Sequence, residues 1–479
     1  MKYCMYTNEL KSNRNCFFLL MVAALTGNVQ PAFGHASEQG LVLLLPTQAY
    51  ATAGTLVVVV SILLVTSLPT HLLSSLFQKI DLGGRGGAKD FSLITSTLAS
   101  VVFLTLIYIG FHGPTDPQNN LLPLTIWTVW WIGLFVVQGT IMDLWRWINP
   151  WIGLMNALDV GKAPILTMPK AWSAWPAVVV FTAFQIYLLA DIAPNDPQRL
   201  ATFALSYWIF TLIGLICFGQ TAWLKQVECF TIVFTMIATL RPFQKGEKME
   251  VGFPGWGTVK LPALDFSHAV LCLVILATGS FDGLHETFWW LAKIGINPLA
   301  FPGRSAVIWT SSLGVCAAIV VLVFTYSIAI WIGVVAVQLR GGSKCPTFWQ
   351  AFRAFSVTLL PIALGYHFAH YLVTFMVQIK YVLSTLSDPL AQGWNLFGLS
   401  AVKVTTGFLN VPETVKMIWL TQAFVVVLSH VLAVLMSHRV AMNLCRDNNS
   451  VALVQIGLTI LMIAYTVFGL WLLASPRGV

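Results

Sequence analysis

The stretch AVIWTSSLGVCAAIVVLVFTYSIAIWIGVVAVQ, residues 306–338, decides the fold class, because it contains no Asp, Glu, Lys or Arg. A helix needs about 20 apolar residues to cross the hydrocarbon core of a bilayer. A single segment in lipid satisfies all its backbone hydrogen bonds internally only as a helix. The stretch therefore predicts a membrane-spanning helix.

Similar apolar runs recur along the whole chain. Hydrophobic residues make up 57% of it and charged residues 9%, whereas charged residues make up about 25% of a soluble globular chain. The deficit extends over the full length, which excludes a soluble domain with one anchor. We predict an all-α, polytopic transmembrane helical bundle of about ten spans. The expected spans are 52–75, 91–111, 121–142, 172–190, 201–221, 262–281, 306–338, 353–379, 416–437 and 451–474.

The beginning of the chain has the pattern of a cleaved secretory signal peptide. Lys2, Lys11 and Arg14 form a basic region, an apolar core follows at 16–25, and Ala32-Phe33-Gly34 offers small residues for cleavage. We expect residues 1–34 to be removed and residues 35–479 to form one membrane-embedded domain. The alternative is an uncleaved first helix.

The loop charges predict the orientation in the membrane. Of the 26 Lys and Arg residues, three lie in the leader, 16 fall in loops on one side and seven on the other. Basic loops stay in the cytoplasm, so this count places the mature N-terminus in the periplasm of a bacterial inner membrane. Residues 226–243 are apolar but closely flanked by Lys225, Glu228 and Arg241. A full span there would reverse the later loops, and we predict a short interfacial or re-entrant helix.

Several functions are excluded by what the chain lacks. The net charge of +8 is not gathered into a basic tract, so nucleic acid is not an expected partner. Gly83-Gly84-Arg85-Gly86-Gly87 lacks the Lys-Ser/Thr of a phosphate loop. The expected partners are the lipid bilayer and an apolar small molecule, and a second membrane subunit stays open.

The richest group of ionisable residues is predicted near the outer face. His367 and His370 are three apart on the eighth span and can share one helix face. Asp282 and His285 have the same spacing at the end of the sixth span. Three or four such ligands suit a divalent transition metal, zinc first and copper or iron next. For His367 and His370, a polar contact between helices and haem ligation remain alternatives.

The other histidines form weaker candidates. Cleavage after Gly34 would leave His35 at the N-terminus, where the amine and the imidazole could chelate copper. His112 precedes Gly-Pro and is expected in a loop. On the inner side, a proton path or a haem between helices is one interpretation and interfacial anchoring is the other; the residues concerned are His71, Asp265, His268, His430 and His438.

Four short motifs resemble bacterial membrane proteins known as fenitrothion hydrolases, and the resemblance extends over most of the mature chain. The motifs are His35-Ala36-Ser37-Glu38 with Leu44-Leu45-Pro46-Thr47, Asn149-Pro150-Trp151, Tyr366-His367-Phe368-Ala369-His370-Tyr371 and Ser429-His430-Val431-Leu432-Ala433-Val434. This resemblance implies metal-assisted attack of water on an organophosphate triester.

The residues permit that chemistry. A metal held by the four ligands named above would lower the pKa of a bound water toward about 7. Glu286 could then act as general base, and Tyr366 or Tyr371 could donate to the phosphoryl oxygen. We therefore expect a metal-dependent hydrolase of apolar esters. The competing hypotheses are a metal-ion or small-molecule transporter that uses the same histidines, and a haem-containing redox subunit.

Overall fold

The computed structural model describes residue 42 and residues 45–477, apart from 68–69, 84–90, 160–163, 246–248, 298, 300–302, 342–345, 400–405 and 446. The predicted signal peptide, its cleavage site and His35 lie outside the described residues, and so does the side chain of His71.

The described chain is almost entirely helical, in agreement with the predicted class. Its elements, in order, are α3 Thr47–Ser67, α4 Thr70–Leu76, β1 Ile80–Asp81, α5 Ser92–His112, α6 Leu121–Pro123, η1 Leu124–Leu134, α7 Phe135–Thr140, α8 Trp145–Ile148, α9 Ile152–Ala157, η2 Lys170–Trp172, α10 Trp175–Ala190, α11 Pro197–Phe218, α12 Gln220–Gln226, α13 Cys229–Ala238, β2 Phe243–Lys245, β3 Met249–Val251, η3 Thr258–Lys260, α14 Phe266–His285, α15 Phe288–Lys293, η5 Arg304–Val307, α16 Ile308–Leu339, α17 Phe348–Ser356, η6 Val357–Leu359, α18 Leu360–Ser387, η7 Gly407–Asn410, α19 Pro412–Leu444, α20 Asn448–Val454 and α21 Ile456–Ala474.

Nine helical segments of the described chain are long and apolar enough to cross a membrane. Each coincides with a predicted span. The remaining predicted span, 172–190, is α10, whose 16 residues fall short of the roughly 20 needed without thinning of the bilayer. The extents of four spans differ from the prediction. The first helix ends at Ser67 and α4 is separate from it, and the ninth extends over Pro412–Leu444. The eighth runs through α17, η6 and α18 over Phe348–Ser387, and the last begins only at α21.

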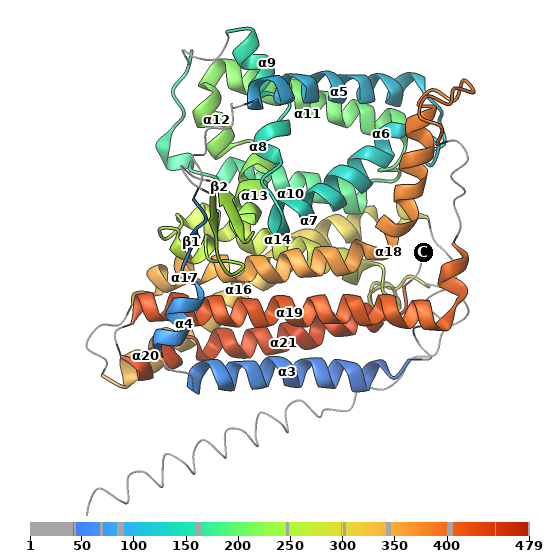
Figure 1. Cartoon of the computed structure of the whole chain (residues 1–479). Helices are drawn as coiled ribbons and strands as arrows, with labels where there is room; N and C mark the ends of the chain where they lie inside the picture. The colour runs from blue at the N-terminus through green and yellow to red at the C-terminus, as the bar shows by residue number, and fades with distance from the viewer. Residues whose placement is uncertain are drawn as a thin grey trace, which may run out of the picture.

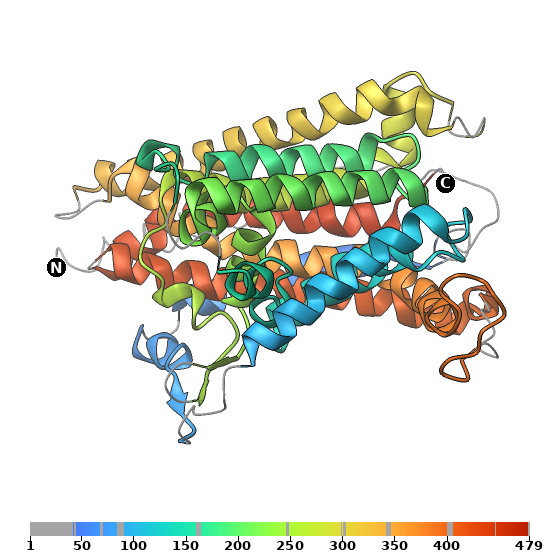
Figure 2. The same cartoon turned by 90° about the horizontal axis from the view of Figure 1, so that it is seen from above.

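The long helices lie side by side and define two ends of the molecule (Figure 1). α3, α19 and α21 pack against one another on one side, where α16 packs on α21, and α5 packs with α11 on the other. Figure 2 shows α5 crossing the rest of the bundle obliquely. α4 and the small sheet lie at one end, and the C-terminus lies at the opposite end.

Contacts between loops agree with the predicted alternation of sides. The Arg199 guanidinium lies 2.6 Å from the Asp191 carboxylate, and Arg304 donates to the Asp191 carbonyl at 2.8 Å. All three residues lie in loops that the order of the predicted spans places on the outer side. At the other end, Lys79 pairs with Glu250, and both were predicted on the inner side. The alternation of loops is therefore consistent, and we refer to the two ends as outer and inner in this sense.

The segment at 226–243 does not cross the membrane. Its helix, α13, has 10 residues and is therefore only about 15 Å long. Most of its side chains are buried, including Val233, Phe234 and Ile237, so it lies inside the protein against α7, α10 and α12. This burial differs from the predicted interfacial helix, and the re-entrant helix stays a prediction.

A three-stranded antiparallel sheet at the inner end is the one departure from an all-α fold in the described chain. Its strand order is β1-β3-β2, with Ile80 opposite Val251 and Gln244 opposite Glu250. Because its strands are two or three residues long, the sheet only ties two inner loops together.

Candidate functional site

Two helices bring the predicted outer residues together. Asp282 and His285 lie at the C-terminal end of α14, and Tyr366, His367 and His370 lie in the first half of α18. α18 packs against α14 and also against η1. Side chains on different faces of α18 therefore contact different neighbours.

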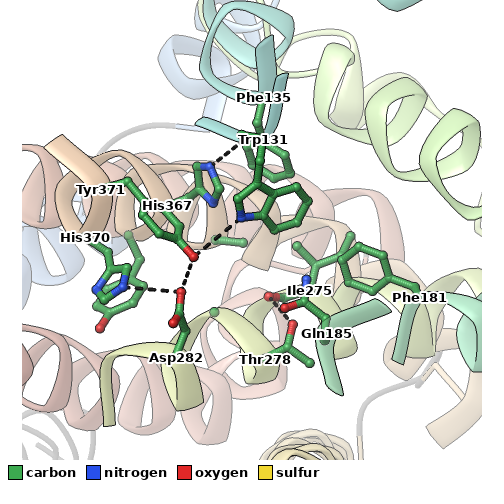
Figure 3. A pocket seen from close by; sticks show the side chains of 13 residues that line it. Trp131, Phe135, Phe181, Gln185, Ile275, Thr278, Asp282, His367, His370 and Tyr371 are labelled. Atoms are coloured by element: carbon green, nitrogen blue, oxygen red, sulfur yellow. Dashed lines mark hydrogen bonds and ion pairs between the residues drawn. The ribbon is translucent and has the colours of Figure 1, made fainter. Parts of the chain in front are cut away.

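The buried Asp282 and the half-buried His370 and Tyr371 form a cluster, which we call the polar centre (Figure 3). Asp282 Oδ2 lies 3.3 Å from His370 Nε2, and the Tyr371 hydroxyl donates to the same oxygen. Arg477 Nη1 lies 3.3 Å from His370 Nδ1. Because arginine can only donate, this contact places the ring proton on Nε2, which donates to Asp282. The carboxylate thus accepts two hydrogen bonds, from His370 and Tyr371. Arg477, on the far side of His370, supplies the opposite charge.

His367 lies beside the polar centre, with its ring centroid 4.8 Å from that of Tyr371, but its hydrogen bond goes elsewhere. Its Nε2 lies 2.9 Å from the carbonyl oxygen of Trp131 on η1, and its ring packs on Phe135 with centroids 4.3 Å apart. The predicted convergence of His367 and His370 on one ion is therefore not the arrangement in this structure, because their common helix lies between two different neighbours.

The predicted metal ligands are divided among three local arrangements. Among the described residues, no three or more His, Cys, Asp or Glu side chains are grouped so that they could hold a metal ion. Asp282 and His370 could supply two metal ligands, but these two side chains are hydrogen bonded to each other. His285 is directed to the backbone, with Nδ1 2.7 Å from the Asp282 carbonyl oxygen. The residues as placed do not fit a three-ligand site, so the metal stays a prediction and we derive no step through it.

Two further outer residues lie at helix ends. Glu286 is the half-buried C-cap of α14 and takes no part in the hydrogen bonds of the polar centre within the described chain. His112 is not in a loop as predicted: it is the last residue of α5. Its ring stacks on Tyr108 with centroids 4.3 Å apart, a local contact one turn away on the same helix.

Tyr366 lies beside the polar centre without joining its hydrogen bonds. Its ring stacks on His370 with centroids 5.8 Å apart, and its buried hydroxyl has no hydrogen-bond partner among the described residues. A Cβ atom at Gly283 would lie 1.8 Å from that hydroxyl oxygen. Glycine at 283 therefore allows α14 to approach α18 closely.

A small cavity adjoins the polar centre. Its volume is about 20 Å³, which is room for about one water molecule. Besides the polar centre it is lined by Gln185 and Thr278, and by Phe181 and Ala363 farther from the outer end. Short contacts therefore connect Arg477 with His370 and His370 with Asp282, and Asp282 borders a small cavity with both polar and apolar lining residues.

The inner candidates make local hydrogen bonds. His268 Nδ1 lies 2.7 Å from Asp265 Oδ1, and Asp265 is the N-cap of α14. His430 Nδ1 lies 2.8 Å from the Val426 carbonyl oxygen, and His438 Nδ1 lies 2.8 Å from the Gln455 amide nitrogen. These contacts account for the placement of each residue, and the proton path or haem between helices stays a prediction.

A second, much larger cavity lies on the other side of η1, and sequence reasoning missed it. Its volume is about 690 Å³, and we call it the apolar cavity. Residues from η1, α5, α11 and α18 line it, among them Leu98, Val102, Trp127, Trp130, Tyr207 and Phe375. Leu98 and Val102 are also exposed on the surface, so the cavity opens toward the lipid.

η1 separates the two cavities. Trp130 lines the apolar cavity, whereas Trp131 lines the small polar one. Similarly, α18 contributes Phe375 to one and Tyr371 to the other. η1 is a π-helix of 11 residues, and π-helical turns are rare and frequent at functional sites. No pattern in the sequence indicates this winding, although the pair Trp130-Trp131 marks its position.

No family model, curated protein or solved structure matches this chain. The resemblance to fenitrothion hydrolases therefore remains a prediction based on the quoted motifs.

Proposed function

We propose that this multi-pass membrane protein is a proton-coupled transporter of a small lipophilic solute. The orientation that we adopt follows the loop charges: a bacterial inner membrane with the mature N-terminus in the periplasm. The single observation that supports transport best is the placement of the polar centre and the apolar cavity on opposite sides of the same π-helix.

The polar centre has the composition of a proton-binding site. Ionisable residues within a membrane are energetically costly and mark proton relays, counter-ions or substrate pathways. With His370 neutral, the charges of Arg477 and Asp282 compensate each other. Protonation of Asp282 would remove its negative charge and weaken the contact with His370 Nε2. The centre thus has two charge states, and the water-sized cavity beside it gives the proton a place to arrive or leave.

Separation of the two cavities favours coupling over catalysis. A general acid or base must come within about 2.6–3.2 Å of the proton that it transfers. A solute in the apolar cavity would instead be separated from Asp282 by Trp131 and the backbone of η1. Proton binding and solute binding are coupled if both change the balance between two conformations of one shared element.

η1 is suited to be that element. A π-helix and an α-helix differ by one residue in their hydrogen-bond spacing. Conversion between them would rotate Trp130 and Trp131 relative to the rest of the helix. The Tyr371 hydroxyl lies 3.5 Å from Trp131 Nε1, and His367 binds the Trp131 carbonyl, so the state of the polar centre acts directly on one side of η1.

The test is proton movement in proteoliposomes that contain a pH-sensitive dye. A panel of lipophilic cations, anions and neutral molecules is added on one side. The wild type should dissipate a pH gradient about tenfold faster than empty liposomes with one class of solute. Asp282→Asn keeps the shape of the side chain but cannot ionise, and it should abolish the effect. Asp191→Asn is the matched control, because Asp191 pairs with Arg199 at the same end of the molecule but does not line either cavity.

Two results would overturn the proposal. One is a wild type that moves no more protons than empty liposomes with any solute of the panel. The other is full activity of Asp282→Asn.

A metal-dependent ester hydrolase is the second candidate. It is supported by the buried Asp282 and the half-buried His370 and Tyr371, which are acid–base groups, and by the motifs that resemble fenitrothion hydrolases. Its test is turnover of a neutral aryl phosphotriester by detergent-purified protein without a gradient, with zinc and with chelator. If Glu286 is the general base, Glu286→Gln should reduce turnover by about 10²–10⁴-fold. Turnover that needs metal and Glu286 would favour this candidate over transport.

A further inference from the structure

The apolar cavity has aromatic walls and no charged lining residue. Four tryptophans line it, and three of them use their indole N–H groups elsewhere. Trp127 donates to the Pro194 carbonyl at 3.2 Å, Trp145 to Thr231 Oγ1 at 2.9 Å, and Trp151 to the Trp208 carbonyl at 3.4 Å. These hydrogen bonds fix the indole rings, which offer a ligand mainly their π-systems.

A buried carboxylate lies directly behind one wall. Tyr207 lines the cavity, and its hydroxyl donates to Glu228 Oε1 at 2.6 Å. Glu228 is 1% exposed. Its carboxylate also accepts from the backbone N–H groups of Phe230 at 3.2 Å and Thr231 at 2.6 Å. Three donors on one carboxyl group suit the ionised form.

Glu228 differs from Asp282 in having no cationic partner. Within the described chain, no Lys, Arg or His nitrogen lies within ion-pairing distance of Glu228. Its three donors are dipoles, which solvate the charge without cancelling it. Burial raises the pKa of the Glu228 carboxyl above its usual value, and the hydrogen bonds from Thr231 and Tyr207 oppose that shift. The apolar cavity therefore lies next to a carboxyl group whose ionised form has no cationic partner in the described chain. A cation bound in the cavity would stabilise that ionised form, because charges interact strongly where the dielectric constant is low.

We propose that the apolar cavity binds a lipophilic organic cation, with Glu228 as counter-ion behind Tyr207. Aromatic faces attract cations through their quadrupole, most strongly when the cation is desolvated. An anion would find no basic lining residue and would be repelled by Glu228. The opening beside Leu98 and Val102 gives a lipophilic ion access from the bilayer. This inference rests on the proposed transport function and names its class of solute.

The experiment compares two ions of nearly the same shape and opposite charge, tetraphenylphosphonium and tetraphenylborate. Binding to the full-length protein in detergent is measured by tryptophan fluorescence and calorimetry. The cation should bind at least about tenfold more tightly than the anion. Glu228→Gln keeps an oxygen that can cap α13 but loses the charge, and it should abolish that preference.

Three further variants separate the effect of the Glu228 charge from effects on folding and from the proton site. Asp196→Asn replaces another acidic N-cap, that of α11, and should leave the preference unchanged. Leu98→Trp fills the lipid-facing opening at an exposed position and should weaken cation binding even if Glu228→Gln does not fold. Asp282→Asn should still bind the cation, because Asp282 belongs to the other cavity.

The outcomes distinguish this inference from the proposed function. Three results would overturn the inference: equal affinity for the two ions, absence of cation binding, or an unchanged preference for the cation in Glu228→Gln. Equal affinity would indicate a site for lipid chains or neutral molecules. Proton movement driven by some other solute would then leave the transport proposal intact. Conversely, cation binding without Asp282-dependent proton movement would support the inference and overturn coupled transport.

Discussion

The two buried carboxylates in the part of the chain that the structure describes are stabilised in different ways. Asp282 in the polar centre has a histidine at 3.3 Å and an arginine behind it, whereas Glu228 beside the apolar cavity has only a tyrosine hydroxyl and two backbone N–H groups. A paired charge responds to protons, because the pair has a neutral alternative. A charge held by dipoles alone keeps an electrostatic field that a cationic ligand can neutralise.

The largest expected effect tests the pairing of Asp282. His370→Ala takes a neutral hydrogen-bond partner away from the charged Asp282, and leaving a buried charged group without its partner costs about 3 kcal/mol or more. We therefore expect His370→Ala to lower the free energy of unfolding by that amount, measured by thermal denaturation in detergent. His285→Ala is the control: its hydrogen bonds go to backbone carbonyls of its own helix, and it should cost clearly less. Equal losses would mean that Asp282 does not depend on His370.

The next prediction concerns the dipoles around Glu228. Tyr207→Phe removes one of three donors, and a hydrogen bond to a charged group is worth about 1.5–3 kcal/mol. The loss should be smaller than for His370→Ala and should appear in the same denaturation measurement. Tyr187→Phe serves as control, since the buried Tyr187 hydroxyl has no partner in the described chain and its removal should cost nothing. If Tyr207→Phe leaves the free energy of unfolding unchanged, Glu228 is protonated in the folded protein.

A third prediction concerns how closely α14 and α18 pack around the polar centre. In Gly283→Ala the new methyl group would meet the Tyr366 hydroxyl, and such overpacking costs about 1–3 kcal/mol. Tyr366→Phe alone should be neutral or slightly stabilising, because it removes an unpaired buried hydroxyl. The double variant should recover most of the stability lost in Gly283→Ala. A double-mutant cycle without coupling would contradict the contact.

The smallest effect is expected at Asp265, an acid at the inner end that is partly open to water. Burial alone would raise the pKa of its carboxyl, but hydrogen bonds from Ser173, His268 and Ser267 outweigh burial and hold that pKa well below its usual range. Asp265→Ala should cost about 0.5–2 kcal/mol at neutral pH, as expected for an N-cap.

The pH dependence of the Asp265 effect has a defined sign. A lowered pKa stabilises the folded state above the unfolded value of about 3.9, and this stabilisation is lost as the pH falls through the folded value. The difference in melting temperature between wild type and Asp265→Ala should therefore shrink below about pH 4. A difference independent of pH would show that the ionised carboxylate is not what stabilises this end.

The helical class and the approximate spans followed from composition and run length, because a bilayer of fixed thickness imposes a simple rule on sequence. The loop charges, and not run length, predicted that the segment at 226–243 does not span, because a span there would reverse the later loops. The predicted depth of the residues in their spans put Asp282 and His370 at the same end of two helices, and the two side chains are in contact. Spacing on the helix failed for His367, because residues three apart on α18 face two different neighbours, η1 and α14.

The sequence by itself determined that this chain crosses a membrane many times, in which order its loops alternate, and that histidines and acids lie among its spans. These properties depend on local hydrophobicity and charge, which each segment carries alone. Only the tertiary structure decided that Arg477 completes the polar centre, that η1 winds as a π-helix between two cavities, and that Glu228 lacks a cationic partner. Such properties depend on which side chains meet across helices far apart in the chain, and pairwise packing leaves no signal in any one segment.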